Sequence, residues 1–315
     1  GGHMRHTITS LFAASVVVVA TAACGGTTEP PTGEGEGEGE GEGEGEAPAG
    51  TRQQTLSYST LSTSDAVERA STAVLTIKDD VDSPRPVIVL LPGWGGNGDV
   101  GARANGQTTL FVDAGYAALN VGFHNTASAP GGTAASFYSD MAESVDGALT
   151  AACADPDLDC AAIALVGVSY GGTQTHPVAR YLRSVGWAGD DGEVVAIVSQ
   201  DAGYTVQDFR DPPYAETNLY SVAMIENQGD LTFPIDGCDF SNCGARERAA
   251  FHDARGDDNV LSLCPEGGSH GSRGFAQWDA WVLSATKTML HDQQGVARFT
   301  GFVEADVDVD NACLP

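Results

Sequence analysis

An apolar run that passes directly into a serine between glycines restricts the fold of this chain more than any other feature. The run covers 161–168 and leads into the sequence Gly-Val-Ser-Tyr-Gly-Gly, in which the serine is Ser169, and then into a helical pattern. Small residues are needed around the serine because a turn from strand to helix is sharp and its backbone is strained. Such a turn would lift the Ser169 hydroxyl into the open at the carboxyl end of a sheet. A helix N-cap serine after a buried strand is the alternative interpretation.

The rest of the domain alternates short β-rich runs with amphipathic helical patterns. Two runs of alternating polarity, 54–60 and 72–78, predict antiparallel strands. Continuously apolar runs, typical of strands buried on both faces, cover 86–91, 116–121, 161–168, 194–199, 220–226 and 260–263. Helical patterns cover 104–113, 134–152, 172–184, 245–255 and 275–291. This alternation predicts an α/β fold with a mostly parallel central sheet of about eight strands and helices on both faces.

Two loops that follow later apolar runs supply the other groups that such a serine needs. Asp230 lies in a Gly-Asp-x-x-x-Pro loop, and His270 lies in a loop of glycines and a serine. Together with the serine turn, these loops resemble those of the α/β-hydrolase superfamily, and the resemblance covers nearly all of 51–315. It implies an α/β-hydrolase fold with Ser169 as nucleophile, Asp230 as orienting carboxylate and His270 as general base. The order Ser, Asp, His along the chain is the one that this fold uses.

The chemistry follows from the weakness of a serine hydroxyl as a nucleophile at neutral pH. A neutral imidazole must take its proton while the oxygen attacks an acyl carbon. Asp230 would fix the tautomer of that imidazole, and Asp201, just after the run 194–199, is the alternative acid. The histidines that lack a glycine-rich setting are expected to be surface or packing residues: His124, His176, His252 and His291.

A glycine-rich loop follows the run 86–91 and resembles the oxyanion loop of the same superfamily. Its sequence is Pro-Gly-Trp-Gly-Gly, with Trp94 at the centre. The resemblance implies that the backbone N–H groups of Trp94 and Tyr170 stabilise the charge that develops on the carbonyl oxygen. The side chains of both residues would line the acyl site. A flexible turn is the alternative, whereas a phosphate-binding loop is excluded because its Lys and Ser/Thr are missing.

The residues before 51 carry signals for export rather than a core. Residues 1–4 read as an expression scar, and 5–24 combine a short basic region, an apolar stretch and small residues before Cys24. This ending resembles a bacterial lipoprotein signal, in which Cys24 is lipidated; an ordinary cleaved signal is the alternative. Residues 25–50 include seven consecutive Gly-Glu pairs and predict a disordered spacer. We therefore expect an exported lipoprotein at the cell surface or in the periplasm, or otherwise a secreted protein, with one catalytic domain over 51–315.

The cysteines agree with export, because six of them remain when Cys24 is set aside. An even number in a chain bound for an oxidising compartment predicts three disulfides. Fifteen connectivities are possible, but sequence proximity favours Cys153–Cys160 and Cys238–Cys243, which leaves Cys264 with Cys313. A zinc site is disfavoured because the chain contains no Cys-x-x-Cys pair.

The chain is strongly acidic, with 43 Asp and Glu against 15 Lys and Arg and a net charge of −28. Such acidity argues against nucleic acid or anionic lipid headgroups as partners, so a lipid anchor would be the only membrane contact. Alternate carboxylates at 155–159 and 306–310 could bind Ca²⁺, although neither run continues as an EF-hand loop. A solvated acidic edge is the favoured interpretation, and we expect no cofactor.

The length of the segment 200–219, which connects two of the apolar runs, indicates how open the site is to substrates. In this fold it is the usual place for a cap over the site, and here only about twenty residues, 200–219, are present. An open site on an exported protein resembles the bacterial cutinase and polyester-hydrolase branch, although Val168 and Tyr170 depart from that branch's usual residues. Dienelactone-hydrolase-like enzymes and carbohydrate esterases have comparable bodies.

We therefore expect a monomer that cleaves small or polymeric carboxylic esters. A peptidase of the same fold and a non-catalytic surface binding protein are the alternatives.

Overall fold

The structure, a computed structural model, describes residues 50–61, 66–79, 84–93, 106–122, 134–187, 194–202, 221–226, 260–263, 270 and 277–291. All of them belong to one compact unit, Glu46–Pro315. Across these residues, no helix is both long enough and apolar enough to cross a membrane.

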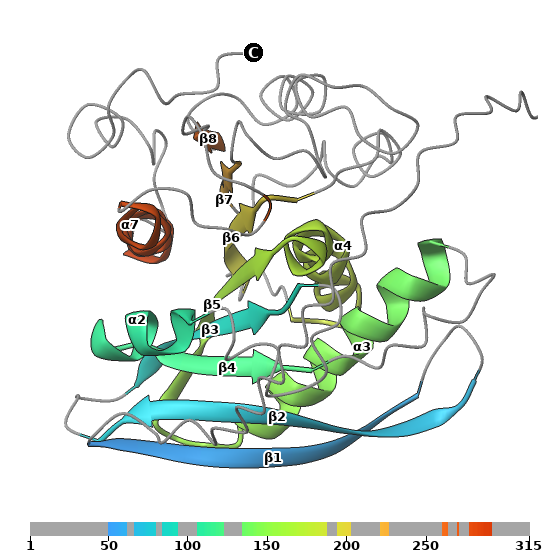
Figure 1. The fold of residues 1–315 in the computed structure, drawn as a ribbon. Coiled ribbons are helices and arrows are strands. Elements are labelled where there is room, and N and C mark those ends of the chain that lie inside the picture. Colours follow the sequence, from blue (N-terminus) through green and yellow to red (C-terminus); the bar gives the residue numbers. More distant parts are fainter. Residues whose placement is uncertain are drawn as a thin grey trace, which may run out of the picture. The chain divides into compact units, whose positions relative to one another are not determined.

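The described strands form a single eight-stranded sheet in the order β1-β2-β4-β3-β5-β6-β7-β8 (Figure 1). β1 pairs antiparallel with β2, and β2 pairs antiparallel with β4; all the other pairs are parallel. The strands are β1 Thr51–Leu61, β2 Glu68–Lys78, β3 Arg85–Leu91, β4 Ala117–Val121, β5 Leu158–Val168, β6 Val194–Gln200, β7 Ser221–Ile225 and β8 Val260–Leu263. The predicted α/β class with a mostly parallel sheet is confirmed.

Helices cover both faces of this sheet, as the continuous apolar runs predicted. They are α2 Gln107–Asp113, α3 Ala134–Ala152, α4 Tyr170–Ser184 and α7 Trp278–His291. Because side chains alternate along a strand, β3 sends Val89 into the core with α3 and α4, and sends Leu90 into the core with α2 and α7. A strand with an apolar layer on each side has no polar face, which explains its unbroken hydrophobic sequence.

The structure differs from the sequence prediction mainly at element ends. β5 begins at Leu158 rather than 161, because Arg85 and Pro86 of β3 pair with Leu158 and Asp159 across a register shift. α2 begins at Gln107 rather than 104, after Gly106 with its positive φ of 62°. The helix predicted over 245–255 lies outside the described residues.

The connection from α3 to β5 is closed by the predicted disulfide Cys153–Cys160. Two aspartates of this loop contact Arg52, whose Nη2 lies 2.8 Å from Asp155 Oδ2 and 3.2 Å from Asp157 Oδ2. Two of the loop's carboxylates are therefore ion-paired with an arginine of β1, and no group of metal-ligating side chains is found among the described residues. The acidic run 306–310 and the pairs Cys238–Cys243 and Cys264–Cys313 lie outside the described residues.

Removing the disulfide should destabilise the domain, because the cross-link restricts the α3–β5 loop in the unfolded chain and its loss makes the unfolded state more favourable. The two cysteines are seven residues apart, so the double variant Cys153→Ala/Cys160→Ala should lose about 2 kcal/mol of unfolding free energy. Arg52→Gln is the control, because this β1 residue contacts the same loop only through exposed ion pairs that should contribute less than about 1 kcal/mol. Urea unfolding of both variants measures the difference, and equal losses would contradict this account.

Candidate active site

The turn between β5 and α4 is held in a conformation that only a few residue types tolerate. Ser169 has φ 55° and ψ −121°, a region that costs a non-glycine residue on the order of 1–3 kcal/mol. On either side of it the backbones touch: a Cβ on Gly167 would collide with the carbonyl of Gly171, and one on Gly171 with the carbonyl of Leu91. The two glycines are therefore required by close approach of β3, β5 and α4.

This geometry bears on the two interpretations of Ser169. Although Ser169 precedes the first residue of α4, its hydroxyl makes no capping hydrogen bond to the described helix. Instead, Ser169 Oγ lies 2.6 Å from His270 Nε2. The serine therefore presents its hydroxyl to an imidazole.

Ser169 and His270 are 101 residues apart in sequence, and they meet because both lie at the same edge of the sheet. Ser169 follows the last residue of β5, and His270 comes after β8, with β6 and β7 between these strands in the sheet. Parallel strands end at the same edge, which is where open α/β sheets place their sites. The predicted pairing of Ser169 with His270 is thus present in the structure.

Two parts of the main chain lie close to the Ser169 hydroxyl: the start of α4 and the backbone at Gly93. Tyr170 is the first residue of α4, and the N–H groups of a helix's first turn point out of its N-terminus. The main chain at Gly93 passes nearby, because a Cβ there would lie 4.0 Å from Ser169 Oγ. Trp94, the second predicted donor, lies outside the described residues.

The other candidate residues are placed as follows. Asp230 lies outside the described residues, so its role stays a prediction. Asp201 is buried directly after β6, with a φ of 43°, and its N–H donates to the carbonyl of Ile225. His176 is buried within α4. His124 and His252 lie outside the described residues, and His291 ends α7.

A buried polar cluster next to the turn was missed by sequence reasoning. Gln107, Gln200 and Trp278 are almost completely inaccessible, and their side chains hydrogen-bond to one another. The sequence shows only that Gln200 follows the apolar run 194–199, and a single glutamine in that position does not predict its hydrogen-bond partners.

No family model and no curated protein matches the sequence, whereas many solved structures match the fold. A dienelactone hydrolase-like promiscuous phosphotriesterase from metagenomic libraries is 19% identical with a TM-score of 0.54, covering 76% of this chain and 99% of that one. A bacterial heroin esterase is 17% identical with a TM-score of 0.57, covering 77% and 85%. A putative dienelactone hydrolase from Klebsiella pneumoniae is 12% identical with a TM-score of 0.55, covering 76% and 99%. The chain has the α/β-hydrolase fold.

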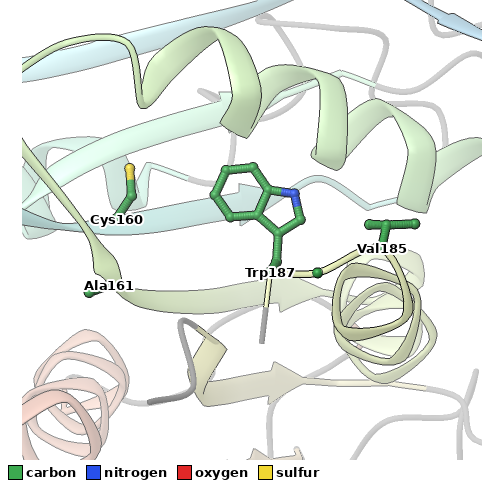
Figure 2. Close-up of a pocket in the computed structure, with 5 residues that line it drawn as sticks. Cys160, Ala161, Val185 and Trp187 are labelled. Atoms are coloured by element: carbon green, nitrogen blue, oxygen red, sulfur yellow. The ribbon is translucent and has the colours of Figure 1, made fainter. Parts of the chain in front are cut away.

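Within the α/β-hydrolase fold, the serine turn is separate from the surface pocket shown in Figure 2. This pocket, of about 420 Å³, is lined by Cys160 and Ala161 of β5 and by Val185, Gly186 and Trp187 after α4. Trp187 Nε1 donates to Asp146 Oδ1 at 2.6 Å, which fixes the indole in the wall. Cys160 and Ala161 lie near the start of β5, whereas Ser169 follows its end, so the pocket is at the other edge of the sheet.

The close approach at the turn predicts a sharp contrast between two glycines. Gly167→Ala should lose about 3 kcal/mol of unfolding free energy, because the added methyl group meets the backbone of Gly171, which cannot move without displacing α4. Gly93→Ala should change it by less than about 0.5 kcal/mol, because its methyl group would lie at an ordinary 3.5 Å from Ser169 Cβ. Chemical denaturation of both variants checks this, and a stable Gly167→Ala protein would contradict the described turn.

Proposed function

We propose that this chain is a serine hydrolase that cleaves carboxylic esters through an acyl-enzyme. The observation that carries the proposal is the 2.6 Å approach of Ser169 Oγ to His270 Nε2 at a strained turn. A hydroxyl presented to an imidazole in this way has no evident structural purpose, since it neither caps the described helix nor packs in the core. The solved structures of similar fold include proteins named as esterases and dienelactone hydrolases, which supports the same reaction class.

In the proposed reaction, His270 takes the Ser169 proton while Oγ forms a bond to the acyl carbon of the ester. The tetrahedral intermediate then collapses, and His270 returns the proton to the departing alcohol. Water repeats the sequence on the acyl-enzyme, releases the carboxylic acid and restores the serine. Asp230 orients the imidazole, and the N–H groups of Trp94 and Tyr170 stabilise the oxyanion, with their side chains lining the acyl site.

Substrate range and placement complete the proposal. An open site suits small acyl esters first, and polymeric esters if the cutinase-like resemblance holds. Export with lipidation at Cys24, followed by the spacer 25–50, would hold the monomeric domain away from a membrane while the acidic domain avoids anionic headgroups. Asp155 and Asp157 of the 155–159 run pair with Arg52, and the proposed acyl transfer uses no cation.

Removing the nucleophile tests the reaction. Ser169→Ala and His270→Ala should each lower kcat on p-nitrophenyl acetate or butyrate by at least about 10³-fold, because neither residue can act without the other. Ser184→Ala is the matched control, since that exposed hydroxyl only bonds the carbonyl of Tyr181 in its own helix. Wild-type turnover no greater than that of Ser169→Ala on every acyl ester would refute an esterase.

Two further readouts separate the alternatives in the same experiment. Labelled peptides would reveal a peptidase, and a fluorophosphonate probe that leaves Ser169 unmodified would indicate a non-catalytic binding protein. A p-nitrophenyl chain-length series beside a polyester film would define the ester.

Lipidation is tested on the full chain in a bacterial host. Cys24→Ser should abolish incorporation of labelled palmitate and release the protein from the membrane fraction, because the proposed lipid is attached through the thiol of Cys24. Equal labelling of wild type and variant would exclude this anchor.

A further inference from the structure

We propose that Gln200 is a positioning residue for the nucleophile: it fixes the Ser169 turn to the helices α2 and α7. This inference rests on the proposed function, because it assigns a supporting residue to the same site. It does not depend on which ester is cleaved.

Gln200, the last residue of β6, holds the turn with both its backbone and its side chain. Its carbonyl accepts a hydrogen bond from the N–H of Ser169 at 2.8 Å. Its Nε2 donates to the carbonyl of Gly167 at 3.4 Å. The first turn of α4 also lies against it, because a Cβ on Gly172 would be 2.9 Å from the Gln200 carbonyl. The residue therefore contacts the turn before, at and after the serine.

Both polar atoms of the Gln200 side chain, Oε1 and Nε2, take part in hydrogen bonds. Its amide exchanges two hydrogen bonds with the amide of Gln107, at 2.8 Å and 3.1 Å. Its Oε1 accepts a third from Trp278 Nε1 at 2.7 Å. With the bond to Gly167, both amide hydrogens and both oxygen lone pairs are used. Because an indole can only donate, the oxygen of Gln200 must face Trp278, which fixes the orientation of the amide.

The two partners of this amide lie at the starts of different helices. Gln107 is the first residue of α2, and Trp278 is the first residue of α7. Gln200 is completely buried and both partners nearly so, so water does not compete for these bonds. The cluster therefore ties the nucleophile turn to two helices on one face of the sheet.

This arrangement has a consequence for catalysis rather than for binding. A residue in a strained conformation keeps it only when its surroundings over-determine it. Without the Gln200 side chain, the turn retains its backbone bond but loses its connection to α2 and α7, so Oγ is held less closely against His270. Misplacement of a reacting group by about 1 Å can lower a rate on the order of 10²-fold.

The test compares two glutamines that undergo the same chemical change. Gln200→Met should lower kcat on p-nitrophenyl butyrate on the order of 10–100-fold per labelled active site, with KM changed by less than about threefold. Gln174→Met is the matched control, since Gln174 is equally buried and its amide has no hydrogen-bond partner among the described residues. It should leave kcat within about twofold of wild type.

An activity-independent readout separates this inference from the proposed function. Amide hydrogen exchange of peptides covering 165–172 should be faster in Gln200→Met than in wild type, while peptides of α3 are unchanged and Gln174→Met behaves as wild type. If wild type hydrolyses no ester but this exchange still rises, the proposed function fails and the positioning role stands. If esters are cleaved and Gln200→Met has wild-type kcat and exchange, the positioning role is refuted.

Two milder variants keep the inference testable if Gln200→Met does not fold. Trp278→Phe removes one donor to the amide, and Gln107→Met removes the reciprocal pair while leaving the bond to Gly167. Each should lower kcat several-fold without a matching change in KM, and a wild-type kcat in both folded variants would overturn the proposal.

Discussion

The approach of α4 to the ends of β3 and β5 is the constraint on which the rest of the site depends. At Gly167 and Gly171 the backbones are so close that a single methyl group has no space. The chain between these glycines must therefore reverse from strand to helix within very few residues, and Ser169 is forced to a positive φ. The positive φ of Ser169 also sets the direction of its side chain, whose hydroxyl faces His270.

A strained turn of this kind can persist only on a rigid support. The sheet provides it, since β3, β5 and β6 are buried under helices on both faces and their ends cannot shift without opening a packed core. The polar backbone at the turn also needs partners, because buried N–H and C=O groups are costly when unpaired. The N–H of Ser169 finds one in Gln200, so the strand beside the nucleophile supplies both packing and hydrogen bonding.

The sequence predicted the parts of this molecule that depend on local pattern. Continuous apolar runs identified the buried strands, and the glycines around Ser169 identified the turn, because a steric requirement leaves a direct trace in residue type. His270 was recognisable by its setting, and the structure brings it to the serine. Asp230 and Trp94 were inferred by the same reasoning and lie outside the described residues, so for them the sequence remains the only basis.

Long-range polar pairing left no such trace. Gln107, Gln200 and Trp278 are separated by 93 and 78 residues, and each has an unremarkable local sequence. The start of β5 was missed for a related reason: Leu158 and Asp159 join the sheet only because β3 offers them partners across an irregular register. In both cases the deciding contact comes from another part of the chain, which a pattern read along one segment does not contain.

The chemical nature of the Gln200 side chain suits its position beside the Ser169 turn. An amide offers two donors and two lone pairs without carrying charge, so it can bind Gln107, Trp278 and Gly167 at once inside an apolar core. A carboxylate in its place could not donate to the carbonyl of Gly167, and its burial would be costly. A neutral amide therefore holds the turn and leaves the charges that would develop in the proposed acyl transfer to the groups that face the substrate.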